Sequence, residues 1–170
     1  MSIETGKEDF VNLLKENRGI IFKICNSYCP NKNDREDLAQ EIIFQLWKSY
    51  NNFNADYKFS TWMYRIALNV AITFYRKENK TSQTIAFTET LPEVEDKRDG
   101  IHEKEENISR LQQFINELKE LDKALMILYL EEKNHKEIAE ILGITETNVA
   151  TKLSRIKDKL KQKFSTIHNI

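Results

Sequence analysis

The stretch that most constrains how this chain can fold is residues 136–163, which read KEIAEILGITETNVATKLSRIKDKLKQK. Apolar residues recur at helical spacing on both sides of Gly143, so the pattern predicts two helices joined by a tight turn. Glycine suits the left-handed backbone that closes a helix, and Thr145 suits the N-cap of the next helix. Together these signals predict a helix-turn-helix, a motif that places its second helix in the major groove of DNA.

The second helix of this motif has two different faces. One is apolar and is expected to face a core, whereas the other combines small polar residues with cations that can approach base edges and phosphates. An ordinary helical hairpin with solvated lysines would share the charge pattern, but the turn, the cap and the charge asymmetry together favour DNA binding. The apolar residues are Val149, Leu153, Ile156, Leu160 and Phe164; the polar ones are Thr147, Thr151 and Ser154, flanked by Lys152, Arg155, Lys159 and Lys161.

Composition favours a helical protein with an uneven distribution of charge. The 170 residues include only 4 Gly and 2 Pro, and 40% of them are hydrophobic, which is enough for packed cores. The formal net charge of −1 conceals two opposite segments. Residues 152–163 hold six Lys or Arg against one Asp, and residues 89–106 hold eight Asp or Glu against three Lys or Arg. The basic segment suits phosphate binding and the acidic one repels phosphate.

Helical periodicity divides the chain into two blocks. The first contains helical patterns over residues 8–28, 34–50 and 60–80, with Asp34 and Ser60 as the expected N-caps and Pro30 ending the first pattern. We therefore expect Leu38, Ile42 and Leu46 to lie on one buried side of the second helix. The apolar side of the third helix should carry Trp62, Ile66, Val70 and Phe74.

Periodicity fails over residues 81–102, where acidic residues gather, and it resumes from residue 103. We predict an all-α fold of two small helical domains, with the helix-turn-helix in the C-terminal one. The expected boundaries are an N-terminal domain at residues 1–80, a flexible acidic linker at 81–102 and a C-terminal domain at 103–170.

Other classes of protein find little support in these residues. There is no glycine-rich phosphate loop, no cluster of metal ligands and no nucleophile–base pairing, so we expect neither an enzyme nor a cofactor or metal. Cys25 and Cys29 have no histidine near them in sequence and are expected to be reduced, buried thiols. No basic-then-apolar signal and no run of transmembrane length is present, so we expect a cytoplasmic protein without membrane insertion.

A second informative segment, residues 57–80, interleaves aromatic and basic side chains. Unstacked single-stranded bases need a π-face to stack on and a cation near the backbone, and this composition supplies both. Core packing is the better explanation for any one of the aromatic residues taken alone, but the group, with its preceding loop and its cations, favours contact with nucleic acid. The aromatic members are Phe59, Trp62, Tyr64, Phe74 and Tyr75, and the basic members are Lys58, Arg65, Arg76, Lys77 and Lys80.

Three segments together resemble the bacterial sigma-70 family of initiation factors. They are DREDLAQEIIFQLW (34–47), YKFSTWMYRIALN (57–69) and LGITETNVATKLSRIKDKL (142–160), and the two-domain layout resembles the extracytoplasmic-function group. The resemblance implies a non-catalytic factor that binds core RNA polymerase through its β′ coiled coil and β flap. Such a factor recognises the −35 and −10 elements of promoter DNA and promotes melting. The family also implies an anti-sigma factor as a further partner.

The resemblance assigns residues to three surfaces. Polymerase binding falls on Asp37, Gln40 and Glu41. Recognition of the −10 element falls on Lys58, Phe59, Ser60, Trp62 and Arg65 for the melted strand, on Asn69, Arg76 and Lys77 for the adjoining duplex, and on the loop Asn51–Tyr57 for a flipped base. Recognition of the −35 element falls on Thr145, Thr147, Thr151, Lys152, Ser154 and Arg155.

Two departures from the family pattern are visible. Ala150 stands where many relatives carry Lys or Arg, so that position offers at most an apolar contact, for instance to a thymine methyl. Trp62 stands without the tandem tryptophan pair of housekeeping members, which fits recognition of a narrow set of promoters. The acidic linker could thread through the polymerase or act as a solvated tether, and the residues do not decide between these roles.

A different class of function remains open at this point. A conventional helix-turn-helix regulator, with an N-terminal half that senses a ligand or dimerises, would also explain the C-terminal motif. It would bind an operator stably without polymerase, and it would need no aromatic and basic melting segment.

Overall fold

The computed structural model describes residues 3–84 and 102–168, and it describes side chains over residues 6–78 and 104–165. Within these ranges the regular elements are all helical, which confirms the all-α prediction. The elements are α1 (Ile3–Glu16), α2 (Arg18–Tyr28), α3 (Lys32–Ser49), the 3-10 turn η1 (Tyr50–Asn52), α4 (Phe59–Thr84), α5 (His102–Glu117), α6 (Glu120–Leu130), α7 (His135–Leu142) and α8 (Glu146–His168).

The predicted helical pattern over residues 8–28 is divided between two helices, which meet at Asn17. Both the backbone N–H and the side-chain amide of Asn17 donate to the carbonyl of Leu13, at 3.2 and 2.9 Å. This side chain competes for a helical carbonyl, as asparagine does, and the helix ends there. The apolar spacing continues across the break, which is why the sequence alone reads as one run.

Both N-caps expected in the first block are wrong. Helix α3 begins earlier, with Asn31 as N-cap, whose side-chain oxygen accepts from the backbone N–H of Asn33 at 2.7 Å. Asp34 therefore lies inside the first turn, where its charge favours the helix dipole instead of capping the helix. Helix α4 likewise begins at Phe59, one residue before Ser60. The rest of the α3 prediction is confirmed, because Leu38, Ile42 and Leu46 are fully buried.

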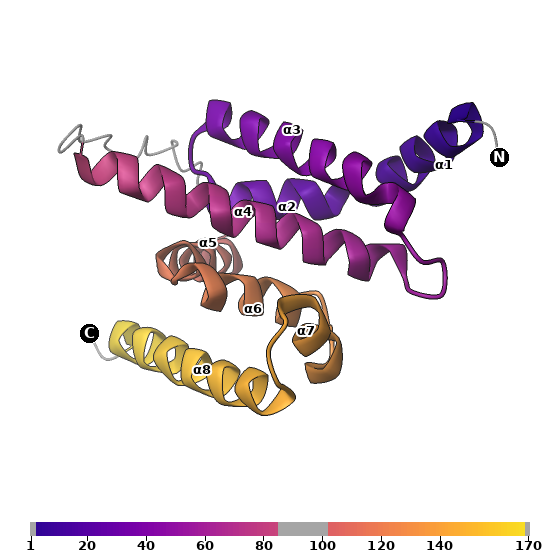
Figure 1. Cartoon of the computed structure of the whole chain (residues 1–170). Helices are drawn as coiled ribbons and strands as arrows, with labels where there is room; N and C mark the ends of the chain where they lie inside the picture. Colours follow the sequence, from indigo (N-terminus) through magenta and orange to yellow (C-terminus); the bar gives the residue numbers. More distant parts are fainter. Residues whose placement is uncertain (1–2, 85–101, 169–170) are drawn as a thin grey trace.

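Helix α4 is the central element of the fold. It packs against α2 and α3 on one side and against α6 and α7 on another (Figure 1). Its fully buried positions include Met63, Ala67, Leu68 and Ala71, whereas the predicted stripe that begins at Trp62 is only partly buried. Because partners flank α4 on more than one side, apolar residues occur around much of its circumference, and periodicity misplaces the core face.

The helix-turn-helix forms as predicted from α7, Gly143 and α8. Gly143 has a left-handed backbone (φ 69°), and its N–H donates to the carbonyl of Ala139 at 2.9 Å. A Cβ at this glycine would meet nothing within 4 Å, so the backbone conformation and not the available space favours glycine. Thr145 caps α8, since its hydroxyl accepts from the N–H of Asn148 at 3.1 Å.

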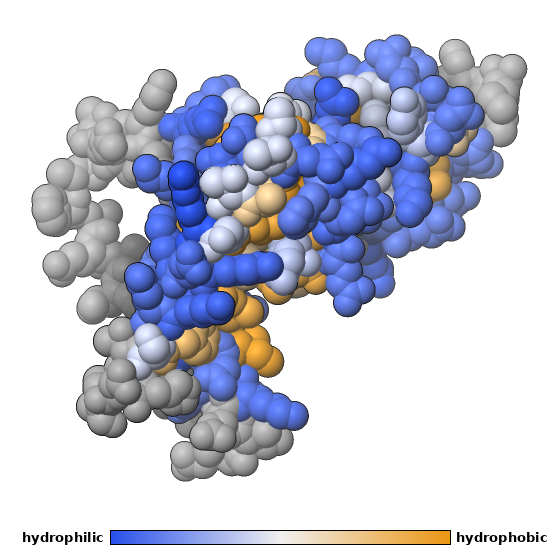
Figure 2. All heavy atoms as spheres, turned by 90° about the horizontal axis from the view of Figure 1, so that it is seen from below, coloured by the Kyte–Doolittle hydropathy of each residue, from blue (hydrophilic) through white to orange (hydrophobic). Residues whose placement is uncertain are grey.

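The N-terminal helices α1–α4 and the C-terminal helices α5–α8 are in direct contact. Helix α2 packs against α5 and α6, and α4 packs against α6 and α7. Seen from below, the surface is largely hydrophilic, with apolar side chains gathered in a band near its middle (Figure 2). The acidic segment 85–101 lies outside the described residues, and α4 continues to Thr84, past the expected boundary at residue 80.

Candidate nucleic-acid interface

Trp62, one of the aromatic residues expected at the −10 element, lines a surface hollow at the start of α4. Trp62 and Arg65 contribute from α4, and the loop before it contributes Phe53 and Tyr57. Glu140 and Ile141 of α7 also line it, so an element of the helix-turn-helix borders the aromatic site. We call this feature the Trp62 hollow, and its lining residues are Asn52, Phe53, Asn54, Tyr57, Thr61, Trp62, Arg65, Glu140 and Ile141.

Three aromatic rings contact Trp62. Phe53 lies 5.2 Å from it, Phe59 lies 5.3 Å from it and Tyr50 lies 6.4 Å from it, measured between ring centroids. Trp62 itself remains partly exposed. A partly exposed ring with its far side held by other rings can accept a stacked base.

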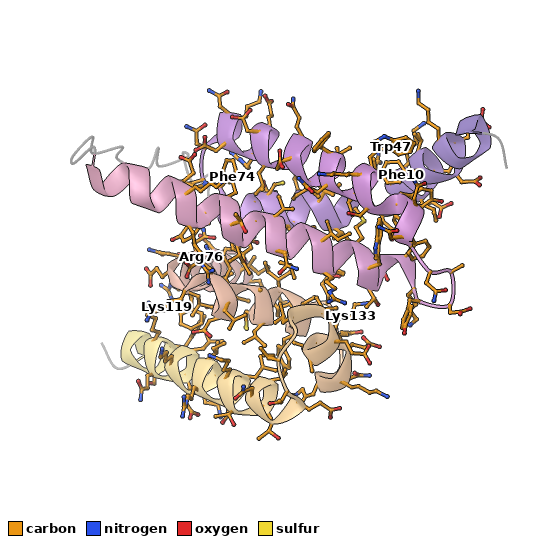
Figure 3. The ribbon with its side chains drawn as sticks, in the orientation of Figure 1. Phe10, Trp47, Phe74, Arg76, Lys119 and Lys133 are labelled. Carbon is orange, nitrogen blue, oxygen red and sulfur yellow. The ribbon has the colours of Figure 1, made fainter. Side chains whose placement is uncertain are left out.

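The predicted −10 residues divide between open surface and the contact between the two halves. Lys58, Arg65 and Asn69 are exposed, and Ser60 is half-buried. Arg76 is exposed too, but its guanidinium pairs with the carboxylate of Glu120 of α6 at 3.4 Å (Figure 3). In this arrangement Arg76 points toward the C-terminal half, so the structure does not bring it together with the Trp62 hollow.

The structure brings part of the expected polymerase surface next to part of the expected −10 surface. Asp37 and Glu41 of α3 line one hollow together with Asn69 and Lys77 of α4. Carboxylates at this place would repel a phosphate, so the duplex-facing role expected of Asn69 and Lys77 meets an unfavourable local field. Sequence spacing within each helix could not reveal this juxtaposition.

Helix α3 also carries an exposed apolar group that sequence reasoning did not assign to any surface. Gln40 is exposed, and Phe44 and Trp47 follow it at the i+4 and i+7 positions, which share a helix face. Phe44 is 55% exposed and Trp47 is 43% exposed. Large exposed apolar side chains beside a polar rim are typical of a surface that binds another protein.

The exposed face of α8 agrees with the arrangement predicted for −35 recognition. Thr147, Thr151, Ser154 and Arg155 are exposed, whereas Val149, Leu153 and Ile156 are buried on the opposite side. Ala150 is exposed in the middle of the polar face, and we call Thr147, Ala150, Thr151 and Ser154 the α8 face. Lys152 differs from the others because it is partly buried at the edge of this face.

The contact between the two halves is built from aromatic, charged and hydrogen-bonding side chains. Lys123 of α6 is 2% exposed, and its ammonium lies 5.1 Å from the ring centres of both Tyr28 and Tyr75. The hydroxyl of Tyr28 donates to the carbonyl of Glu120 at 2.7 Å. Burial lowers the pKa of Lys123 and raises the pKa of Tyr28. This contact joins residues about ninety positions apart in the sequence, so no local sequence pattern could predict it.

A second group of contacts lies at the other end of this interface. Lys23 of α2 pairs with the carboxylate of Glu131, and Lys133 lies over the ring of Tyr64 at 5.8 Å (Figure 3). Burial, together with the charge of Glu131 and its hydrogen bond, raises the pKa of Tyr64. The outer face of α4 is thereby covered along much of its length by α6 and α7.

The described residues offer little to a metal ion. Over 3–84 and 102–168, no group of three or more His, Cys, Asp or Glu side chains could hold one. Cys25 and Cys29 are free and buried, as predicted, and desolvation raises their pKa values to about 12 and about 11. None of the helices in this part of the chain is long and apolar enough to cross a membrane.

Comparison with known proteins decides the family. Sigma-70 region 2 matches residues 13–81, and Sigma-70, region 4 matches residues 108–160, so the two matches together cover well over half of the chain. The chain belongs to the sigma-70 family. The sigma factor is similar to ECF RNA polymerase sigma factor SigW of Bacillus subtilis, at 29% identity over 94% of this chain and 91% of the relative. It is also 30% identical to RNA polymerase sigma factor YlaC of the same organism, over 75% of each chain.

Solved structures agree with the fold of this sigma factor. CnrH in complex with the cytosolic domain of CnrY has a TM-score of 0.67 at 17% identity, covering 94% of this chain and 90% of that one. The sigma factor RpoE in complex with the anti-sigma factor NepR from Bartonella quintana has the same TM-score and identity, covering 96% of this chain and 98% of that one. The family resemblance drawn from the sequence is therefore confirmed, and the chain is a sigma factor of the extracytoplasmic-function group.

Proposed function

We propose that this sigma factor recognises the −10 element with the Trp62 hollow and the −35 element with the α8 face, while α3 binds core RNA polymerase. As a member of its family it directs polymerase to promoters. We propose that it does so in the cytoplasm and without catalysis of its own. The residues proposed for each surface are those assigned by the resemblance: Asp37, Gln40 and Glu41 for polymerase; Lys58, Phe59, Ser60, Trp62, Arg65, Asn69, Arg76 and Lys77 for −10; Thr145, Thr147, Thr151, Lys152, Ser154 and Arg155 for −35.

The observation that carries the proposal is Trp62. Its ring is supported by Phe53, Phe59 and Tyr50 and opens onto a hollow that also contains the cation of Arg65. Stacking a base on an aromatic ring contributes roughly 1–3 kcal/mol, which offsets the few kcal/mol needed to unstack the base from a duplex. A conventional operator-binding regulator has no use for such a site.

The close contact of the two halves implies that the sigma factor must open before it reads a promoter. The −35 and −10 elements are about 25 base pairs apart, or about 85 Å of B-form duplex at about 3.4 Å per base pair. In the structure, however, α4 packs directly on α7, and Ile141 borders the Trp62 hollow only a few residues before α8 begins. The Trp62 hollow and the α8 face cannot reach both elements in this arrangement. We propose that the structure represents a closed state and that α4 separates from α6 and α7 on promoter binding.

We also propose an anti-sigma factor as a partner that acts on the closed state. Two structural neighbours, at 17% identity, were solved with a bound partner: the cytosolic domain of CnrY and the anti-sigma factor NepR. Both cover at least nine-tenths of this chain, with its two halves together. A protein that binds across both halves would keep the Trp62 hollow next to α7.

Transcription in vitro with core RNA polymerase tests the proposal. Trp62→Ala should reduce opening of a duplex promoter about 5- to 150-fold, because a stacking energy of roughly 1–3 kcal/mol corresponds to that range. Opening is followed by permanganate reactivity of unpaired thymines, and binding of duplex −35 DNA is measured in parallel as the control. Equal loss in both measurements, or no loss in either, would contradict the stacking role.

A further inference from the structure

We infer that Tyr50, supported by Phe10, is a positioning residue for promoter opening: it holds the ring of Trp62 at the angle in which Trp62 can stack on a base. The inference rests on the role proposed above for Trp62. It adds two residues outside the Trp62 hollow to the machinery that opens promoters. One of them, Phe10, also lies before residue 13, where the match to Sigma-70 region 2 begins.

Tyr50 sits at the junction of the aromatic contacts behind Trp62. Its ring is 6.4 Å from Trp62 in an edge-on arrangement (62°) and 6.2 Å from Phe53 in a stacked one (12°). Phe53 in turn touches Trp62 at 5.2 Å. Tyr50 therefore reaches Trp62 both directly and through Phe53, and these two routes limit how the indole can turn.

Tyr50 contacts Trp62 from outside the hollow in which a base would stack. Phe53 lines the Trp62 hollow and can itself touch a base there, but Tyr50 does not line that hollow. Tyr50 instead lines a hollow on the other side of Phe53, where its neighbours are Asp9 and Glu16 of α1. The carboxylates beside it make that second hollow a poor place for a phosphate backbone. An effect of Tyr50 on promoter opening must therefore act through the rings that it touches.

Phe10 fixes Tyr50 from behind. It is 4% exposed, and its ring centre lies 5.1 Å from Tyr50 and 5.1 Å from Trp47. Phe10 lies within the first helical pattern, residues 8–28, where the sequence alone gives it no link to the −10 segment. In the structure the Phe10 ring also contacts Trp47 on the exposed side of α3 (Figure 3). The ring contacts continue from Phe10 through Tyr50 to Trp62. Docking of a protein at Trp47 would then press on the rings that orient Trp62.

The size of the effect follows from the geometry of the ring pairs. An aromatic pair in an edge-on or offset arrangement contributes enough to change an equilibrium about 2- to 10-fold beyond simple burial. Replacing Tyr50 by leucine removes its pairs with Trp62, Phe53 and Phe10 while keeping an apolar side chain. Replacing it by phenylalanine keeps every ring contact. We expect Tyr50→Leu to lower promoter opening about 2- to 10-fold and Tyr50→Phe to retain it.

The experiment uses the full chain assembled with core RNA polymerase at saturating concentration. Transcript yield is compared on a duplex promoter and on the same promoter with a pre-melted −10 bubble, and permanganate reactivity is followed on the duplex alone. Tyr50→Leu and Phe10→Leu should be defective on the duplex, and the pre-melted template should restore most of the lost transcript. Affinity of Tyr50→Leu for core polymerase should stay unchanged, as should the affinity of both variants for duplex −35 DNA, and thermal unfolding is recorded to show that the variants are folded.

A second measurement reports on the indole itself. Trp47→Phe leaves Trp62 as the single tryptophan, so fluorescence anisotropy follows the motion of Trp62 in the free protein. Adding Tyr50→Leu in that background should lower the anisotropy, and adding Tyr50→Phe should not. A merely structural role would lower the unfolding temperature without changing the motion of the ring in the folded protein.

Two outcomes separate failure of this inference from failure of the proposed role of Trp62. If Trp62→Ala opens the duplex promoter as well as the natural chain does, the stacking role itself is lost, and the inference falls with it. If Trp62→Ala is defective but Tyr50→Leu opens promoters normally, the stacking role stands and the positioning role of Tyr50 is refuted. In the supported case, adding Tyr50→Leu to Trp62→Ala produces no further loss, because both changes act through one ring.

Discussion

A single hydroxyl group on Tyr28 offers the sharpest way to weaken the contact between the two halves of the sigma factor. The Tyr28 side chain is 2% exposed, and its hydroxyl donates to the carbonyl of Glu120 on α6 at 2.7 Å. Its ring stays in contact with Tyr75 at 6.2 Å and lies below the ammonium of Lys123. Tyr28→Phe keeps these ring contacts and removes nothing but the hydrogen bond from Tyr28 to Glu120.

The expected magnitude follows from that one bond. Loss of a neutral hydrogen bond inside a protein costs about 1 kcal/mol, and the remaining ring contacts are unchanged. This free energy corresponds to about a fivefold shift from the closed toward the open arrangement. The shift acts on the equilibrium between the arrangements, so each half should keep its own helices.

Energy transfer between two dyes measures this equilibrium. Cysteines introduced at the exposed positions Glu8 of α1 and Lys161 of α8 can carry the dyes, since the native thiols Cys25 and Cys29 are buried. Tyr28→Phe should raise the ratio of low-transfer to high-transfer molecules about fivefold.

The matched control makes the same chemical change inside one half. Tyr129→Phe removes a hydroxyl at the end of α6, where the ring holds Lys157 of α8 at 4.3 Å. It should leave the transfer distribution as it is. An unchanged distribution in Tyr28→Phe, or an equal shift in both variants, would refute the view that this hydrogen bond holds the halves together.

Three further predictions follow from particular residues. Arg155→Ala should weaken −35 DNA binding and lower the slope of log affinity against log salt by about 1, whereas Arg110→Ala on α5 should leave the slope unchanged; a salt titration of both variants checks this. Glu132 has a left-handed backbone (φ 60°), so Glu132→Gly should raise the free energy of unfolding by about 1 kcal/mol in denaturant titration. Burial raises the pKa values of Cys25 and Cys29 above the value of about 9 that they have in the unfolded chain. The stability that neutral thiols allow should therefore be present below about pH 9 and should be lost as the pH rises from 9 toward 11–12. The loss should reach roughly 1 kcal/mol per thiol at pH 10, and the variant with alanine at both positions should lack this part of the pH dependence.

Local chemistry accounts for the parts of the fold that the sequence predicted correctly. The helix-turn-helix depends on Gly143 and Thr145, whose roles are fixed by backbone conformation and by one side-chain hydrogen bond. The buried side of α3 depends on the spacing of Leu38, Ile42 and Leu46 along one helix. Each of these features is decided within a few residues, so a single sequence is sufficient to find it.

Features decided by competition or by distant partners were not predictable in the same way. Asn31 and Asp34 are both good capping residues three positions apart, and only the structure shows that Asn31 takes the role. The core face of α4 was misplaced because helices from both halves pack on it. Lysines usually lie at the surface, but Tyr28 and Tyr75 from the other half of the chain enclose Lys123.

The burial of Lys123 explains how one contact can be well formed in the closed state and still give way to promoter DNA. Leucine at this position would leave apolar surface exposed on opening, and the halves would resist separation by the full hydrophobic term. A buried ammonium instead costs desolvation, which lowers the pKa of Lys123 and which its two cation–π contacts and the nearby Glu120 offset only in part, so this side chain adds little to the stability of the contact. On opening, the ammonium regains water, and the exposed ion pairs Lys23–Glu131 and Arg76–Glu120 break at a small cost in free energy. The chemistry of the contact therefore suits a closed state that polymerase and promoter can displace.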